Sequence, residues 1–345
     1  MTGMFKMDTQ AGIQDTVAQL KIPALRALLH YDLDWESIRF NQLSATCTFK
    51  INTTEEGSFL LRLHAGLIKE EIVSEIVWLD FLNKRMNMPL PQGVQARNGA
   101  SVVRVFQENG TQVYASLMRW VEGEHEYGEL SEEQLVQEGV LLAKLHQASQ
   151  QFEIPASFTR PVWGEHSFRE SMEHLEQHYD KFLTEAEFSL YQSAAEMICS
   201  RMAGLRAEHE HFGMIHGDLH QGNIVFHQGE PRPIDFGRCG FGYHLYDIAQ
   251  TILGLHPTQR ALVIKGYESI RELGEDWQSK LATFAVMVMI ENYSHHAPDP
   301  RETEGLKVEQ PYAQEILKRY RNGEPFLFQS FQGIYCSDKE GGAGK

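Results

Sequence analysis

The chain has 345 residues, of which 42% are hydrophobic, 10% aromatic and 23% charged, a composition typical of a soluble globular protein. This length exceeds what one hydrophobic core usually supports, so we expect two domains. There is no run of about eighteen apolar residues, so a membrane span is excluded, and the net charge of −16 disfavours a nucleic-acid partner, whose phosphates need a basic surface.

The first 119 residues predict a small mixed domain. Residues 8–30 follow a helical pattern that Pro23 interrupts, so two short helices are expected there, within an N-terminal extension at residues 1–34. Strands are expected at residues 39–43, 47–52, 58–64, 101–107 and 112–120, with one helix at residues 67–85. Residues 35–119 therefore predict a small antiparallel sheet with one helix.

Residues 120–335 read as mainly helical. Ser131 and Gln134 form a capping box that starts a helix ending near Gln147. Further helices are expected at residues 167–212, with a break near residues 183–184, and at residues 245–324, on either side of a loop-rich block at residues 215–243. We expect residues 336–345 to be a disordered tail.

Charge and cysteine usage add two expectations. Residues 1–119 carry 12 basic and 12 acidic residues, so the whole net charge of −16 lies in residues 120–345. This asymmetry suits a cationic or neutral partner for the second half. The N-terminus lacks the apolar stretch of a secretory signal, and the cysteines form no CxxC pair, so we expect reduced thiols in a cytoplasmic protein, with neither a disulfide framework nor a zinc site. The four cysteines are Cys47, Cys199, Cys239 and Cys336.

The informative chemistry lies in residues 215–242, IHGDLHQGNIVFHQGEPRPIDFGRCGFG. Asp218 precedes Asn223 by five residues, which is the spacing of the catalytic loop of kinases. Residues 224–234 predict a hairpin that brings Asp235 back beside Asn223. An amide oxygen and a carboxylate form a hard oxygen site, which suits Mg²⁺. We therefore expect Asp218 to be catalytic and Asn223 and Asp235 to be metal ligands.

HGDLHQGNIVF, followed by IDFG and by YDIA, resembles the aminoglycoside phosphotransferase and choline kinase superfamily over roughly residues 35–330. The resemblance implies an α+β, bilobal protein-kinase-like fold, with a nucleotide lobe at residues 35–119 and a mainly helical lobe at residues 120–335. It implies an ATP- and Mg²⁺-dependent phosphotransferase that acts on a hydroxyl group of a small molecule. It also implies that Asp247 braces the catalytic loop and that His216 is structural.

A strand residue, usually lysine, contacts the nucleotide phosphates in kinases and pairs with a helix glutamate. Arg62 stands at this place, as in the branch that resembles homoserine kinase type II, and arginine can grip phosphate oxygens bidentately. In the helix at residues 67–85, Glu75 falls within a stripe of apolar residues. Because a buried carboxylate needs a partner, we expect Glu75 to pair with Arg62.

Two further segments are expected to contact the nucleotide. The loop at residues 44–48, which includes Ser44 and Thr46, lies between the first two strands, where kinases cover the phosphates. The strand that ends with Met118 and Trp120 matches the position of a hinge whose backbone binds the adenine edge.

The sequence leaves the acceptor and some alternatives open. Residues 163–212 hold 10 acidic and 4 basic residues, which favours an amine-bearing acceptor such as an aminoglycoside, a choline-like amine or homoserine. A protein serine/threonine kinase and a nucleotide-binding pseudokinase are alternatives on the same fold. The sequence does not indicate the oligomeric state. For Arg238, directly after the Asp-Phe-Gly, a contact with phosphate and a pairing with surface acids are both open, and we expect the pairing with surface acids.

Overall fold

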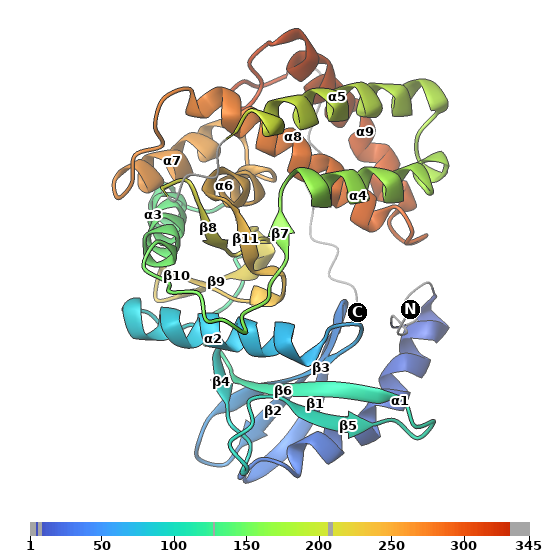
Figure 1. Cartoon of the computed structure of the whole chain (residues 1–345), viewed down its shortest axis with the longest axis vertical. Coiled ribbons are helices and arrows are strands. Elements are labelled where there is room, and N and C mark those ends of the chain that lie inside the picture. Colours follow the sequence, from blue (N-terminus) through green and yellow to red (C-terminus); the bar gives the residue numbers. More distant parts are fainter. Residues whose placement is uncertain (1–4, 6–8, 127, 206–209, 332–345) are drawn as a thin grey trace. The chain divides into compact units, whose positions relative to one another are not determined.

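The structure, a computed structural model, describes residue 5 and residues 9–126, 128–205 and 210–331 (Figure 1). It divides into two compact units. The sheet unit contains the chain up to Glu122 and the loop Glu153–Arg160, and the helical unit contains Gly123–Phe152 and the chain from Pro161 onward. Cys336 and the tail expected at residues 336–345 lie outside the described residues.

The sheet unit contains one antiparallel sheet and two helices. Its elements are α1 (Gln10–Leu28), β1 (Trp35–Leu43), β2 (Thr46–Thr53), β3 (Ser58–His64), α2 (Lys69–Arg85), β4 (Gln92–Val94), β5 (Val103–Phe106) and β6 (Gln112–Arg119). The strand order is β1-β2-β3-β6-β4, with β5 also paired to β6. The five predicted strands are confirmed. The three-residue strand β4 was not predicted, since it is too short to show an alternating pattern.

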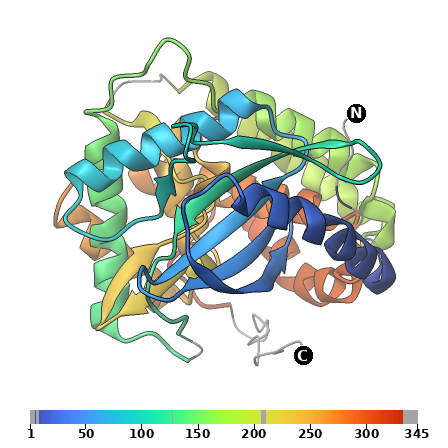
Figure 2. The same ribbon diagram turned by 90° about the horizontal axis from the view of Figure 1, so that it is seen from below.

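The two faces of this sheet differ in chemistry, because side chains alternate along each strand. One face is apolar: residues such as Phe49, Leu61 and Leu117 share a core cluster with Leu20 and Ala24 of α1. Figure 2 shows α1 lying across the sheet. The opposite face carries polar side chains of β2, β3 and β6.

The two short helices expected at residues 8–30 form a single helix, so that expectation is wrong. Pro23 lies inside α1, where it removes one backbone hydrogen bond and costs about 3 kcal/mol in a helix interior. The apolar stripe continues past it, since Leu20, Ala24 and Leu28 are all buried. Burial of this stripe against the sheet offsets the cost of the proline.

The helical unit holds short strands and seven α-helices within the described residues. Its elements are α3 (Glu132–Ser149), β7 (Val162–Trp163), α4 (Glu165–Glu176), η1 (Tyr179–Lys181), α5 (Glu185–Ala203), β8 (Phe212–Ile215), η2 (Gln221–Asn223), β9 (Ile224–His227), β10 (Glu230–Pro233), η3 (Phe236–Arg238), β11 (Gly240–Tyr243), α6 (His244–Ile252), α7 (Pro257–Glu268), α8 (Trp277–His296) and α9 (Thr303–Asn322). The capping box of Ser131 and Gln134 begins α3, as predicted. The predicted break near residues 183–184 precedes α5, which begins after the N-cap Thr184.

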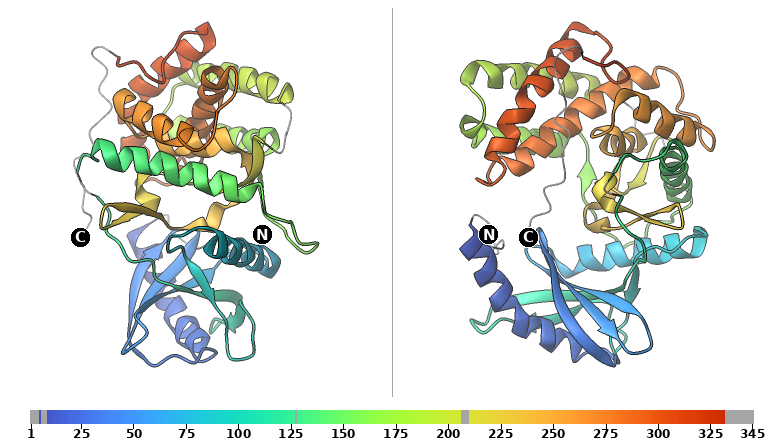
Figure 3. Two further views of the ribbon diagram at one scale, coloured as in Figure 1. Left: turned by 90° about the vertical axis from the view of Figure 1, so that its left-hand side faces the viewer. Right: turned by 180° about the vertical axis from the view of Figure 1, so that it is seen from behind.

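Helices α3 and α7 pack side by side with almost no space between their backbones (Figure 3). A Cβ atom added to Gly266 would lie 2.0 Å from the carbonyl oxygen of Val136, and one added to Gly139 would lie 1.9 Å from that of Val263. Backbone atoms cannot give way as a flexible side chain can. Only glycine therefore fits at these two positions.

We predict that Gly266→Ala lowers the free energy of unfolding by about 1–3 kcal/mol, the usual cost of overpacking a core. The control is Gly305→Ala in α9, where nothing lies within 4 Å of the added Cβ. This change should stabilise the protein by up to about 1 kcal/mol through helix propensity. Urea unfolding of the two variants measures both effects, and equal midpoints would contradict the close crossing.

No helix in the described ranges is long and apolar enough to cross a membrane. Cys47, Cys199 and Cys239 are buried free thiols, as expected.

Candidate active site

Asp218 and Asn223 lie together on the loop between β8 and β9. The side-chain nitrogen of Asn223 donates to the backbone oxygen of Asp218 at 2.8 Å and lies 3.4 Å from its carboxylate Oδ2. The short helix η2 turns the chain between the two residues. Because the amide nitrogen faces Asp218, the amide oxygen of Asn223 is left to accept from, or to coordinate, another group.

Asp247 of α6 holds the start of this loop, as the sequence resemblance implied. Its carboxylate accepts hydrogen bonds from the backbone nitrogens of His216 and Gly217, both at 2.7 Å. The imidazole of His146 lies 3.2 Å from the same carboxylate. Burial raises the pKa of Asp247, while His216 and the two backbone N–H groups oppose that rise. The carboxylate therefore fixes the backbone of His216 and Gly217, the two residues that precede Asp218.

Gly217 is required for the path of the loop. Its φ is +79°, in the left-handed region, and an added Cβ would lie 2.5 Å from the carbonyl oxygen of Arg238. The chain at Asp218 can therefore pass close to the segment after Asp235 only if residue 217 lacks a side chain.

The predicted hairpin is confirmed and brings Asp235 next to Asn223. Strands β9 and β10 pair with Pro233 opposite Ile224, and the nitrogen of Ile234 donates to the carbonyl oxygen of Asn223 at 2.9 Å. Asp235 follows directly, with an exposed side chain and a left-handed backbone (φ 58°). Such a conformation is uncommon outside glycine and is concentrated at functional sites.

The residues present fit a hard divalent cation. Asn223 offers an amide oxygen and Asp235 an exposed carboxylate, which are the oxygen ligands that Mg²⁺ prefers. Across the described ranges, no group of three or more His, Cys, Asp and Glu side chains is arranged to hold a metal ion. His216 instead lies 3.0 Å from the carbonyl oxygen of Ile234 and packs on Phe236, and His220 accepts from the nitrogen of Gly222.

Arg238 does not pair with surface acids, so that expectation is wrong. Its guanidinium lies over the ring of Trp163, at 4.5 Å, and Tyr246 accepts a hydrogen bond from it. Burial opposes its charge, but Tyr246, Asp218 and Glu291 together raise the pKa of Arg238. The arginine turns inward because the aromatic pair and the buried acid provide partners there.

Glu291 of α8 completes this interior cluster. It is buried, and it accepts a hydrogen bond of 2.6 Å from the hydroxyl of Tyr246. Burial raises the pKa of Glu291 to about 7, against the effects of Tyr246 and Arg238. Sequence reasoning missed Trp163, Tyr246 and Glu291, since they come from three separate elements and no spacing along the chain connects them.

In the sheet unit, the predicted pair of Arg62 and Glu75 is confirmed. Arg62 Nη1 donates to Glu75 Oε1, and both side chains are buried. Arg62 lies on the polar face of the sheet, opposite Thr48 of β2 and Ser116 of β6. Glu75 belongs to α2 and is buried there. The apolar stripe therefore identified the correct glutamate of this helix as the partner of Arg62.

The two other segments predicted to contact the nucleotide lie at the β1–β2 hairpin and at the end of β6. Ser44 lies at the tip of the β1–β2 hairpin, but Thr46 and the two residues after it belong to β2 and pair with β3. Met118 is buried and is flanked by β3 and β4, so its backbone lies inside the sheet. Trp120 follows the end of β6, and its nitrogen donates to Ser58 at 3.0 Å. Their contacts with a nucleotide stay predictions.

The acidic residues of α4 and α5 mainly face solvent. Glu170, Glu173 and Glu196 are exposed, and Glu187 serves as the capping partner of Thr184. The charged groups that interact with Asp218 include Arg238 and His295. Burial, followed by His296 and Arg238, lowers the pKa of His295 to about 4, so this imidazole is neutral at pH 7. An acidic wall beside Asp218 is therefore not found among the described residues of α4 and α5.

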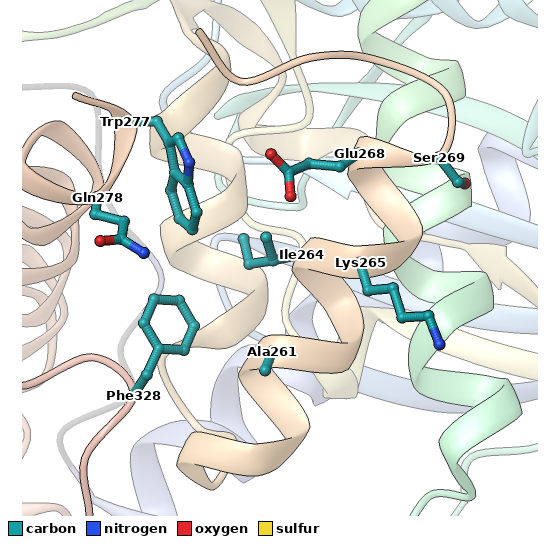
Figure 4. Close-up of a pocket in the computed structure, with 8 residues that line it drawn as sticks. All are labelled: Ala261, Ile264, Lys265, Glu268, Ser269, Trp277, Gln278 and Phe328. Atoms are coloured by element: carbon teal, nitrogen blue, oxygen red, sulfur yellow. The ribbon is translucent and has the colours of Figure 1, made fainter. Parts of the chain in front are cut away.

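A shallow pocket of about 500 Å³ lies elsewhere in the helical unit, on one side of α7 (Figure 4). Trp277 and Phe328 face Ile264 across it, while Lys265 and Glu268 lie at its border. None of the predicted site residues lines this pocket.

Known proteins resemble this chain in sequence. A sequence model of the phosphotransferase enzyme family matches residues 38–279. An uncharacterized protein of Synechocystis sp. is 26% identical over 275 residues, which cover 77% of this chain and 75% of that protein.

Solved structures show the same fold. A microcompartment-associated aminopropanol kinase has a TM-score of 0.75 and 24% identity, covering 90% of this chain and 98% of its own. An amicoumacin kinase in complex with AMP-PNP, Ca²⁺ and Ami has a TM-score of 0.73 and 17% identity, covering 90% of this chain and 96% of its own. The predicted α+β, protein-kinase-like fold is confirmed.

Proposed function

Because the chain belongs to the phosphotransferase enzyme family, we propose that it transfers the γ-phosphate of ATP to a hydroxyl group of a small molecule, with Mg²⁺ as the metal. The observation that carries this proposal is the catalytic loop. Asn223 holds Asp218 by a hydrogen bond, and the β9–β10 hairpin returns Asp235 to the same end of the loop.

Asp218 would orient the acceptor hydroxyl and accept its proton as the oxygen attacks phosphorus. Its position depends on the loop backbone, which Asp247 fixes through two N–H groups. Positioning of this kind supplies much of the rate in phosphoryl transfer, because little covalent chemistry is left to the protein.

Asn223 and Asp235 would hold the divalent cation through one amide and one carboxylate oxygen. The cation would neutralise charge on the phosphate oxygens of the donor. The left-handed backbone of Asp235 supports this assignment, because such conformations are concentrated at functional sites.

Arg62 would bind phosphate oxygens of the donor while Glu75 fixes its guanidinium. An arginine has five N–H donors in a rigid fork whose geometry matches phosphate oxygens, and one of those donors binds Glu75. Ser44 and Thr46 would lie near the phosphates and Trp120 near the adenine, as the sequence predicted.

The acceptor is proposed to carry an amine. The support is the net charge of −16, all of it contributed by residues 120–345, together with the aminopropanol kinase among the similar structures. Since the acids of α4 and α5 face solvent, this charge would act as a long-range field that raises the encounter rate of a cation.

The experiment is ADP release from ATP and Mg²⁺ with matched cationic, neutral and anionic hydroxyl compounds and a protein acceptor, at two ionic strengths. We expect turnover with a small amino alcohol, and we expect its rate advantage to shrink at high salt. Turnover with the protein acceptor but with none of the small molecules would identify a protein kinase. Nucleotide binding without any turnover would identify a pseudokinase. A preference for the anionic compounds would overturn the proposal that the acceptor carries an amine.

A further inference from the structure

Helix α6 contacts the catalytic loop on both sides of Asp218. Asp247 binds the two residues before it, as described above. Thr251 lies one turn further along α6 and is fully buried, and its hydroxyl donates to the carbonyl oxygen of Leu219 at 2.7 Å. Because Leu219 directly follows Asp218, the same helix fixes the backbone before and after this residue.

Gln221 is a side chain of the loop itself that contacts two helices. Its Nε2 donates to the carbonyl oxygen of Thr251 at 2.9 Å and to Glu138 Oε2 at 3.3 Å. A side-chain amide carries two N–H groups, so one can bind the carbonyl oxygen and the other the carboxylate. Gln221 therefore connects the short helix η2 to α6 through Thr251 and to α3 through Glu138.

Glu138 of α3 is the acidic partner in this connection. Its side chain is 1% exposed, and within the part of the chain that the structure describes its Oε1 has no hydrogen-bond partner. Burial raises the pKa of Glu138 to about 7, and the hydrogen bond from Gln221 opposes the rise. A buried carboxyl group is costly unless it is hydrogen-bonded, so Gln221 offsets part of that cost. Buried acids with shifted pKa values are enriched at functional sites, and this one contacts the catalytic loop.

The other end of η2 is Asn223, the proposed ligand of the divalent cation. Its side-chain nitrogen donates to the backbone of Asp218, and its backbone carbonyl accepts from Ile234 in the β9–β10 hairpin. These contacts fix Asn223 relative to the loop and the hairpin. The side chain of Gln221, at the first position of the same three-residue helix, connects this segment to the longer helices α3 and α6.

We propose that Gln221, held by Glu138 and Thr251, is a positioning residue for the amide oxygen of Asn223. This inference rests on the proposed function, in which Asn223 and Asp235 hold a divalent cation. Gln221 does not ligate the cation. It holds η2 against α3 and α6, so that the oxygen of Asn223 is oriented before the cation binds. Groups that orient a metal ligand typically contribute about 10–100-fold in metal affinity or activity.

The test uses Mn²⁺ as the probe, because it prefers the same oxygen ligands as Mg²⁺ and its binding is followed by electron paramagnetic resonance. Mn²⁺ is titrated into the full chain in the presence of ADP, at a temperature where circular dichroism shows each variant fully folded. Gln221→Met keeps the length of the side chain but removes both donors, and we expect Mn²⁺ to bind about 10-fold more weakly. The affinity for ADP without metal should not change. Gln192→Met, at an exposed position of α5, is the matched control and should leave both affinities unchanged.

A pair of variants at Glu138 tests the same connection from the other side. Glu138→Gln keeps an oxygen that can accept from Gln221, so we expect it to bind Mn²⁺ as the wild type does. Glu138→Leu removes the acceptor and should weaken Mn²⁺ binding without a change in the affinity for ADP alone. If Gln221→Met does not fold, this pair decides: a selective loss in Glu138→Leu supports the inference, and equal Mn²⁺ affinities overturn it.

A purely structural role of Gln221 predicts a different result. Gln221→Met would then be less stable but would bind Mn²⁺ like the wild type when folded, which overturns the inference. Equal weakening of Mn²⁺ and of ADP alone would show a general distortion and would also overturn it. Wild-type protein that binds no Mn²⁺ with ADP would overturn the proposed metal site itself, whereas tight wild-type binding with unchanged variants removes the inference alone.

Discussion

Asp218→Asn is expected to lower kcat by about 10²–10⁴-fold, the usual contribution of a positioned general base. The substitution keeps the size of the side chain and the contact with Asn223, but it removes the group that accepts the proton. The affinity for ATP should change little, because Asp218 acts on the acceptor hydroxyl. The rate is measured with saturating ATP and acceptor, and the affinity by calorimetry on the same preparation.

Two outcomes would contradict this role. A loss of ATP affinity as large as the loss of rate would place Asp218 on the donor side of the reaction. Retention of more than about a tenth of the wild-type rate would show that another group accepts the proton. Asp180→Asn, which changes an exposed acid of the same unit, controls for the loss of one charge.

The sequence predicted those parts of the site that depend on local spacing. Asp218 and Asn223 are five residues apart on one loop, and a tight turn is enough to bring them together. Asp235 required one more step, a hairpin predicted from two short strands, residues 224–227 and 232–234, on either side of a turn. Glu75 was found because a carboxylate inside an apolar helical stripe needs a buried partner, and Arg62 was the cation at the expected strand position.

The remaining parts depend on contacts that no local pattern encodes. Arg238 follows the Asp-Phe-Gly, and its inward orientation results from Trp163 and Glu291, which come from elements far away in the sequence.

The fold shows the same division between local and long-range information. Strand alternation identified five strands of the sheet, but Pro23 led to a false break in α1. Intrinsic propensity disfavours proline in a helix, and only the tertiary contact with the sheet decides that the helix continues. The close crossing of α3 and α7 at Gly139 and Gly266 is likewise invisible until both helices are placed.

Asp247→Asn is expected to lower both the stability and the rate. The two backbone N–H groups of His216 and Gly217 donate to separate carboxylate oxygens at 2.7 Å, and an amide can offer only one oxygen to them. The NH₂ group would face a donor, so one buried N–H loses its partner. Leaving one buried donor unsatisfied costs about 1–3 kcal/mol, and more when the lost partner is charged.

The rate should fall further than the stability loss explains, because the same two N–H groups fix the backbone that carries Asp218. We expect kcat to decrease at a temperature where circular dichroism shows the variant fully folded, with ATP affinity close to that of the wild type. Asp180→Asn again serves as the control, since its side chain is exposed. A variant that is less stable but keeps its kcat when folded would show that Asp247 supports the fold alone. A variant with wild-type stability would show that the hydrogen bonds to His216 and Gly217 contribute little, and that the loop is positioned by other contacts.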